Sequence, residues 1–309
     1  MKLFVGIDKS ALHRLNREQI KVMTSHTTVA ITSSLLIEIL ADKAKPEKKL
    51  QKGARPEVLF SKTGLIANVV ADYLSIIDAE IKGKKIPTAT KKINPSCPNT
   101  AAIITSNTND KARWENGDFT EEDFALATEW RKLKSSLDFE ITNRQNKDKI
   151  INFLKKINIE APTTWTECRA MASLSVAADL QSNFSHSAHI GRFVKDGTTK
   201  SILNARWPSG VSEPWISMPY TFECMVMAET FLWAIANNIK VVNDNNKLKD
   251  IGPRSSHFTD LQYAFYLPFF DVFVSDDDMQ LSLLRTFSRE HQIIVRTSEL
   301  TSFLGKIGQ

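Results

Sequence analysis

Acidic residues stand at the ends of predicted strands and in the first turns of two predicted helices. Asp8 follows the apolar run 3–7, and an acidic triplet, 276–278, follows the run 271–275. Glu38 and Asp260 lie near the beginnings of two predicted helices. Because an open parallel sheet binds its ligands beyond the carboxyl ends of the strands, we expect these carboxylates to face one crevice.

Gathering carboxylates has an electrostatic cost that a bound cation removes. Two unit charges about 4 Å apart repel by about 4 kcal/mol at an effective dielectric constant near 20. A set of oxygen ligands favours Mg²⁺ or Mn²⁺ over zinc. Such ions lower the pKa of bound water and stabilise an in-line attack on phosphorus. The acids therefore indicate a metal site suited to phosphodiester hydrolysis.

The elements that must position these acids alternate between strand and helix at both ends of the chain. Strands are predicted at 3–7, 28–31, 271–275 and 293–295, and amphipathic or capped helices follow each of them. This alternation is typical of parallel strands joined by right-handed crossovers. We therefore expect an α/β fold of three layers, α/β/α, around a central parallel sheet.

The middle of the chain does not alternate. Between Pro46 and Pro214 it is rich in lysine, and apolar residues recur at helical spacing in the runs 65–77, 124–137, 150–157 and 165–180. The sequence thus predicts a discontinuous α/β domain made of residues 1–45 and 216–309. Residues 46–215 are predicted to be a helical insertion that caps the site or binds substrate.

Both ends of the chain resemble PIN-domain ribonucleases. In that family a helix opens with Asp and is followed by a strand that ends in Val, then Thr or Ser, then any residue, then Asp. The segment from Asp260 to Asp277 is similar to this arrangement. The run 4–8 resembles the first strand and first acid of the family, and the run 35–40 resembles its second acidic motif. The run 293–300 resembles its last strand and helix.

The resemblance implies a set of site residues. By position, the catalytic metal ligands would be Asp8, Glu38, Asp260 and Asp277, and Ser275 would supply a hydroxyl to the site. Asp276 falls on a variable position of the motif and is a further candidate ligand. The triplet Asp276, Asp277 and Asp278 leaves the choice of the fourth ligand open. Lys9 stands where the family usually has a small residue.

The resemblance also implies a function. It predicts a metal-dependent endoribonuclease that uses Mg²⁺ or Mn²⁺ and leaves a 5′-phosphate and a 3′-hydroxyl. It permits a toxin or defence role, with an inhibitory or regulatory protein as a further partner. Two alternatives stay open, because members of the fold also include structure-specific DNA nucleases, and a PIN-like protein can be an inactive scaffold or nucleic-acid-binding module.

The charge of the chain is compatible with a nucleic-acid partner. The 309 residues carry a formal net charge of +5, with an isoelectric point near 9.0. A segment with several prolines, 82–106, contains five lysines and no acid; these are Lys82, Lys84, Lys85, Lys91 and Lys92. Such a loop suits a phosphate backbone, and a merely solvated loop is an equal alternative. RNA is the expected partner.

Cysteine and histidine spacing gives little support to other metal sites. Cys97, Cys168 and Cys224 form no Cys-x-x-Cys pair, so neither a zinc knuckle nor a disulfide framework is indicated, and a reducing cytoplasm is expected. His186 and His189 share a helical spacing without a third ligand nearby in sequence. No window approaches about 20 apolar residues, so no membrane span is expected.

Overall fold

The computed structural model of the chain consists of two compact units. The first unit comprises Met1–Asp72, Lys92–Ser136 and Tyr266–Gln309, and the second comprises Tyr73–Lys91 and Leu137–Phe265. The structure describes residues 3–43, 55–71, 73–81, 104–105, 108–125, 127–128, 152, 160–181, 219–242, 248–249 and 258–307. Each unit is described by itself.

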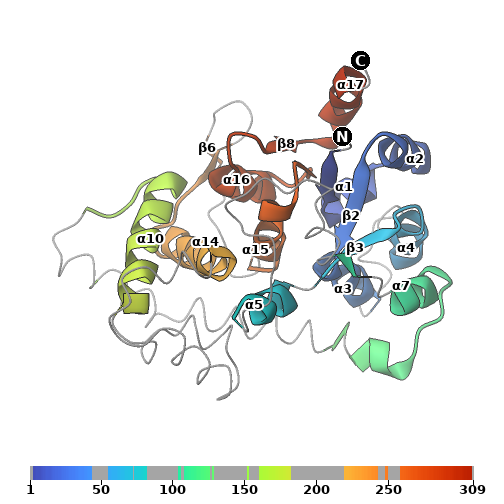
Figure 1. Cartoon of the computed structure of the whole chain (residues 1–309), viewed down its shortest axis with the longest axis horizontal. Helices are drawn as coiled ribbons and strands as arrows, with labels where there is room; N and C mark the ends of the chain where they lie inside the picture. Colours follow the sequence, from blue (N-terminus) through green and yellow to red (C-terminus); the bar gives the residue numbers. More distant parts are fainter. Residues whose placement is uncertain are drawn as a thin grey trace. The chain divides into compact units, whose positions relative to one another are not determined.

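A six-stranded sheet forms the centre of the first unit (Figure 1). Its strands are β1 (Phe4–Ile7), β2 (Thr28–Thr32), β3 (Asn68–Val70), β4 (Ile104–Thr105), β7 (Val272–Val274) and β8 (Ile293–Val295). The spatial order is β4-β3-β2-β1-β7-β8. The strands β3, β2, β1, β7 and β8 are all parallel, and β4 pairs antiparallel with β3 at one edge. The predicted α/β class and the parallel sheet are confirmed, whereas the three-layer PIN-like arrangement stays a prediction.

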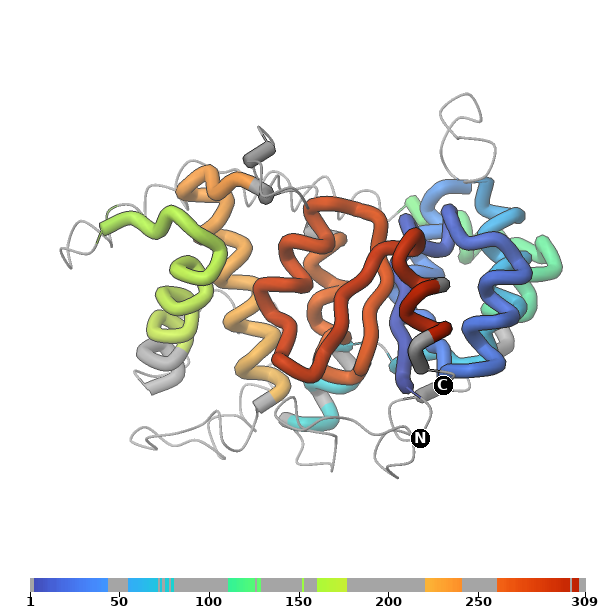
Figure 2. Tube along the Cα trace, turned by 90° about the horizontal axis from the view of Figure 1, so that it is seen from above, coloured from blue at the N-terminus to red at the C-terminus, as the bar shows by residue number. Residues whose placement is uncertain are grey.

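The direction of strand addition reverses beside β1. From β1 the sheet grows on one side through β2 and β3, and on the other side through β7 and β8. Figure 2 shows how the two ends of the chain, drawn in blue and red, come together in this unit. Such a switch in direction opens a crevice at the carboxyl ends of the two central strands, where doubly wound sheets bind ligands. Here those ends belong to β1 and β7.

The helices of the first unit lie between or after its strands in the sequence, and side chains cap the first turn of several of them. They are α1 (Lys9–Arg14), α2 (Arg17–His26), α3 (Ser33–Asp42), α4 (Pro56–Thr63), α7 (Thr108–Glu115), α16 (Asp278–Phe287) and α17 (Thr297–Ile307), with a 3₁₀ turn, η4, at Leu267–Phe269. The sequence predicts one helix over 10–19, but the chain ends α1 and restarts at Asn16, which forms a capping box with Gln19. The cap of α3 is Thr32 rather than a following serine.

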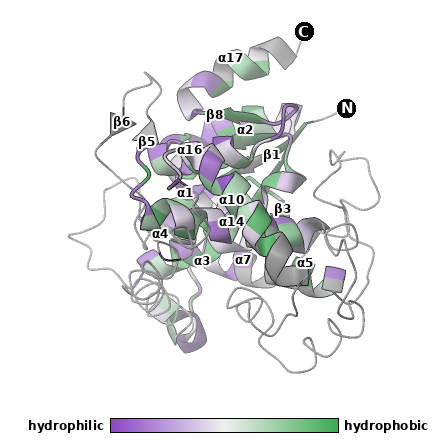
Figure 3. Cartoon of the chain, turned by 90° about the vertical axis from the view of Figure 1, so that its left-hand side faces the viewer, coloured by the Kyte–Doolittle hydropathy of each residue, from purple (hydrophilic) through white to green (hydrophobic). Residues whose placement is uncertain are grey.

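The core of this unit is packed closely around β1. A Cβ atom at Gly6 would lie 2.8 Å from ring atoms of Phe270 and Phe273, so the strand needs glycine at this position. The ring of Phe4 stacks on Phe270 with centroids 5.1 Å apart. In Figure 3 the strands are mainly hydrophobic, whereas α17 carries both hydrophobic and hydrophilic residues. The buried sheet therefore holds the loops at its carboxyl edge in a fixed place.

The second unit is mainly helical. It contains α5 (Tyr73–Ile81), α10 (Trp165–Gln181), α14 (Pro219–Ala236) and α15 (Phe258–Phe265), and a small antiparallel pair, β5 (Val241–Val242) and β6 (Leu248–Lys249). The helix α14 packs against α10, α15 and α5. Its first turn is capped by Glu80 of α5, whose buried carboxylate accepts hydrogen bonds from the amides of Tyr220 and Thr221.

The boundaries of the two units differ from the predicted division. Strands β3 and β4 lie within 46–215, for which the sequence predicts mostly helices. Val69 and Val70 fit a helical repeat, but a short buried run has the same pattern in a strand, and these residues pair with Ile31 and Thr32 of β2. The role of the range 46–215 as a cap stays a prediction. In the described ranges no helix combines the length and hydropathy needed to cross a bilayer.

Candidate functional site

Asp8 is the buried acid at the switch point of the sheet. It directly follows β1, and its amide donates to the carbonyl of Val274 in β7 over 3.2 Å. Its carboxylate caps α1 by accepting the amide of Ala11 at 2.8 Å. It also accepts the hydroxyl of Ser275 at 2.6 Å and that of Ser10 at 2.8 Å. Three elements thus fix one carboxylate, which is 4% exposed.

The surroundings of Asp8 make its ionised form costly. Burial raises its pKa from the ordinary value of 3.8 to about 7, although the hydrogen bonds from Ser275, Ala11 and Ser10 act in the opposite direction. The negative charge of Glu38 adds to the rise. Among the predicted acids, Glu38 is thus one whose charge acts on Asp8, and the shared metal site of the two acids stays a prediction.

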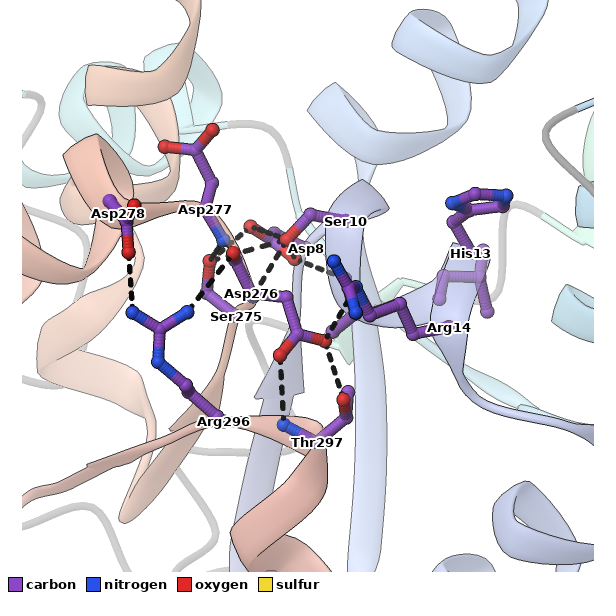
Figure 4. A network of polar contacts seen from close by, with 12 residues as sticks. Asp8, Ser10, His13, Arg14, Ser275, Asp276, Asp277, Asp278, Arg296 and Thr297 are labelled. Atoms are coloured by element: carbon purple, nitrogen blue, oxygen red, sulfur yellow. Dashed lines mark hydrogen bonds and ion pairs between the residues drawn. The ribbon is translucent and has the colours of Figure 1, made fainter. Parts of the chain in front are cut away.

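Two serines link Asp8 to the acidic triplet (Figure 4). The hydroxyl of Ser10 donates to Asp8 and accepts the amide of Asp276 at 2.8 Å. The hydroxyl of Ser275 donates to Asp8 and accepts the amide of Asp277 at 3.2 Å. Each hydroxyl has one proton, and in both cases this proton is donated in a hydrogen bond to Asp8. The serines therefore orient Asp8 and fix the backbone of the loop after β7.

The three acids of the triplet have different environments. Asp276 accepts the amide of Thr297 at 3.3 Å and its hydroxyl at 2.5 Å, so it holds the first turn of α17. Asp278 accepts the guanidinium of Arg296 at 2.5 Å. Asp277 caps α16 with one oxygen, which accepts the amide of Gln280 at 2.8 Å, and its side chain is exposed. Within the triplet, Asp277 is thus the acid most open to a ligand.

Helix termini support this group of acids. Asp8, Asp276 and Asp277 each accept an amide from the first turn of a helix, namely α1, α17 and α16. A helix N-terminus carries roughly half a positive charge. The three termini therefore offset part of the repulsion among carboxylates that lie along the same edge of the sheet.

A lysine lies between two acids on α3. The ammonium group of Lys9 is 2.5 Å from Asp42 and 3.3 Å from Glu38, which are one helical turn apart. Burial lowers the pKa of Lys9, but the charges of Glu38 and Asp42 more than compensate, so the pKa is raised. Glu38 is therefore partly neutralised by Lys9.

Asp260 is the third residue of α15 and belongs to the second unit. It is partly buried. Its predicted role as a ligand beside Asp8 stays a prediction. Seven other residues singled out from the sequence lie outside the described residues: Lys82, Lys84, Lys85, Lys91, Lys92, His186 and His189.

The fit of a divalent cation can be judged from the donors. Among the described residues no three side chains of histidine, cysteine or acid are grouped closely enough to hold a metal. Asp8 nevertheless carries a carboxylate whose ionised form is costly, because it is buried and, to a smaller extent, because Glu38 is negatively charged. A cation would relieve that cost, and carboxylate oxygens suit Mg²⁺ or Mn²⁺. The ligand type therefore suits such an ion, although the described residues do not group three ligands, and Asp277 is the exposed acid of the loop after β7.

Several residues that shape the site were not selected from the sequence. Five such residues each contact a predicted acid or the residue next to one in the sequence. They are Ser10, Asp42, Arg14, Arg296 and Thr297. One local signal pointed to Ser10, since Asp8, Lys9 and Ser10 are three polar residues directly after a buried strand. The others are distant in sequence from their partners, and only the pairing of strands brings them together.

A separate open pocket of about 470 Å³ lies in the second unit, lined by residues 161–165 and 237–240. It contains none of the predicted acids.

Comparison with known proteins adds no relative: no family model, no curated protein and no solved structure matches the chain.

Proposed function

We propose that this chain is a metal-dependent nuclease that hydrolyses phosphodiester bonds, with RNA as its substrate and Mg²⁺ or Mn²⁺ as its cofactor. The environment of Asp8 supports this proposal most directly. Asp8 is a buried carboxylate at the topological switch point, whose pKa is raised by burial and to a smaller extent by Glu38, and two hydroxyl groups donate to it. Perturbed acids at such a place are typical of functional sites.

Each residue of the site has its own proposed role. Asp8 and Glu38 would bind the cation, and Asp277 would add a carboxylate from the loop after β7. Ser10 and Ser275 hold Asp8 in one orientation. When bound, the ion supplies Lewis acidity and a nucleophile near neutral pH, so no histidine is needed as a base.

The test is a Mn²⁺-dependent cleavage assay on total RNA, transfer RNA and single-stranded DNA, with cut sites mapped. Asp8→Asn should lose cleavage, and Asp118→Asn, which changes an exposed acid of the same unit, should retain it. The expected products carry a 5′-phosphate and a 3′-hydroxyl. Cleavage that persists in excess EDTA, or products ending in a 2′,3′-cyclic phosphate, would refute the proposal.

One observation favours a second candidate, an inactive nucleic-acid-binding or scaffold protein. The ammonium group of Lys9 already neutralises part of the charge of Glu38 and Asp42, which lowers the demand for a metal ion. Calorimetric titration with Mn²⁺ separates the two candidates. A wild-type chain that binds RNA but neither binds Mn²⁺ nor cleaves any substrate would favour the scaffold.

A further inference from the structure

Basic side chains flank the acidic site on the corner formed by α1 and α2. Arg14 is the last residue of α1, and its side chain is 68% exposed. Its Nε atom lies 3.8 Å from a carboxylate oxygen of Asp276. Arg17, at the start of α2, is also exposed and donates to the carbonyl of Ser61 at 3.2 Å. Figure 4 shows Arg14 next to Asp276 on the side of the site formed by α1.

The local field at this corner is positive. The ammonium group of Lys62 donates to the carbonyls of Leu12 and His13 at the end of α1. The pKa of His13 is lowered by its burial and by the nearby charges of Lys62, Arg14 and Lys9. The acid of these two helices, Glu18, pairs with Lys21 at 2.7 Å. An anion is therefore favoured beside a site whose own side chains are acidic.

The two arginines near the triplet differ in their freedom to meet a ligand. Arg296 is 21% exposed, pairs with Asp278 and donates to the carbonyl of Asp276, so its guanidinium is held by the loop. Arg14 makes a long, solvent-exposed pair with Asp276, and such pairs contribute little. Asp276 keeps its bonds to Thr297 if Arg14 moves. Arg14 can therefore exchange this contact for a phosphate at small cost.

We propose that Arg14 is a substrate-positioning residue that binds a phosphate of the nucleic-acid backbone beside the acidic site. A guanidinium pairs with two phosphate oxygens at once, which fixes both distance and angle. Arg14 then holds the backbone while the carboxylates act on the neighbouring phosphodiester. This inference rests on the proposed nuclease function and adds the side from which the substrate enters, over the corner of α1 and α2.

The experiment measures binding of a fluorescent single-stranded RNA by anisotropy in EDTA, so that neither metal nor cleavage is required. Arg14→Gln should weaken binding by about tenfold and make the dependence of affinity on salt less steep by about one released ion. Arg14→Lys should restore part of the affinity. Lys21→Gln is the matched control, since it removes one positive charge from an exposed side chain of α2, and it should change affinity by less than about twofold.

A kinetic readout separates positioning from a merely structural role. In Mn²⁺, Arg14→Gln should raise KM with little change in kcat if it removes a contact made equally before and during the reaction. Equal affinity and salt dependence for wild type and Arg14→Gln would overturn the inference and leave the nuclease proposal standing. A wild-type chain that binds neither RNA nor single-stranded DNA would overturn both.

Discussion

Replacing Asp8 by Asn should stabilise the fold at alkaline pH while removing function. Burial of Asp8 raises its pKa from 3.8 to about 7, so the unfolded chain ionises this group more readily than the folded chain does. The contribution of Asp8 to the stability of the fold is therefore greatest below about pH 4 and is lost as the pH rises towards 7. The cost of ionising Asp8 in the fold corresponds to about 4 kcal/mol above pH 7.

Asparagine has nearly the same shape and carries no charge, so it avoids that cost. Its carbonyl can still accept the amide of Ala11, and the hydroxyls of Ser10 and Ser275 can turn to suit an amide nitrogen. We expect Asp8→Asn to be more stable than wild type by about 2 to 4 kcal/mol near pH 8.5, and by close to zero near pH 4. Titration of every other group cancels in this comparison to a first approximation.

The assay is urea unfolding followed by circular dichroism, in EDTA, at about pH 4, 6 and 8.5. Asp118→Asn is the control, because it removes an exposed acid of the same unit and should show no comparable dependence on pH. Added Mn²⁺ should then stabilise wild type but not Asp8→Asn, since a ligand that binds only the folded state stabilises it. An Asp8→Asn chain that is less stable at every pH, or a difference independent of pH, would refute the electrostatic reasoning.

Three further substitutions test how the fold is held. Glu80→Ala should destabilise the second unit by about 1 to 3 kcal/mol in urea unfolding, because it leaves buried amides at the start of α14 without an acceptor, and Glu80→Gln should cost less. Gly6→Ala should cost about 1 to 3 kcal/mol through overlap with two phenylalanine rings, whereas Gly305→Ala in α17, where nothing lies within 4 Å of the added carbon, should not destabilise. Lys9→Met should lower the free energy of unfolding at neutral pH by about 3 kcal/mol, because two acids of α3 lose their counter-charge. The loss should be smaller at pH 4. An equal loss at neutral pH and at pH 4 would show that packing rather than charge is responsible.

Local features of the site follow from the order of residues alone. The apolar runs before Asp8 and Ser275 predict buried strands, and β1, β7 and β8 occur close to the predicted positions. Polar residues after such runs cap helices through contacts that span only three residues, as Asp8 and Asp277 do. Because these interactions are local, their pattern is legible in the order of residues, and the α/β class with parallel strands follows from it.

How these strands and acids are arranged in space depends on the tertiary structure. The pairing of β1 with β7 places the switch point between segments more than 260 residues apart, where Ser275 donates to Asp8. It turns Asp276 towards α17 and leaves Asp277 exposed. The pairing of β3 with β2 likewise makes a strand of residues 68–70, which fit a helical repeat equally well. Strand pairing and burial depend on which surfaces meet in space. Because one apolar pattern is compatible with more than one pairing partner, the partner of each strand cannot be read from the sequence.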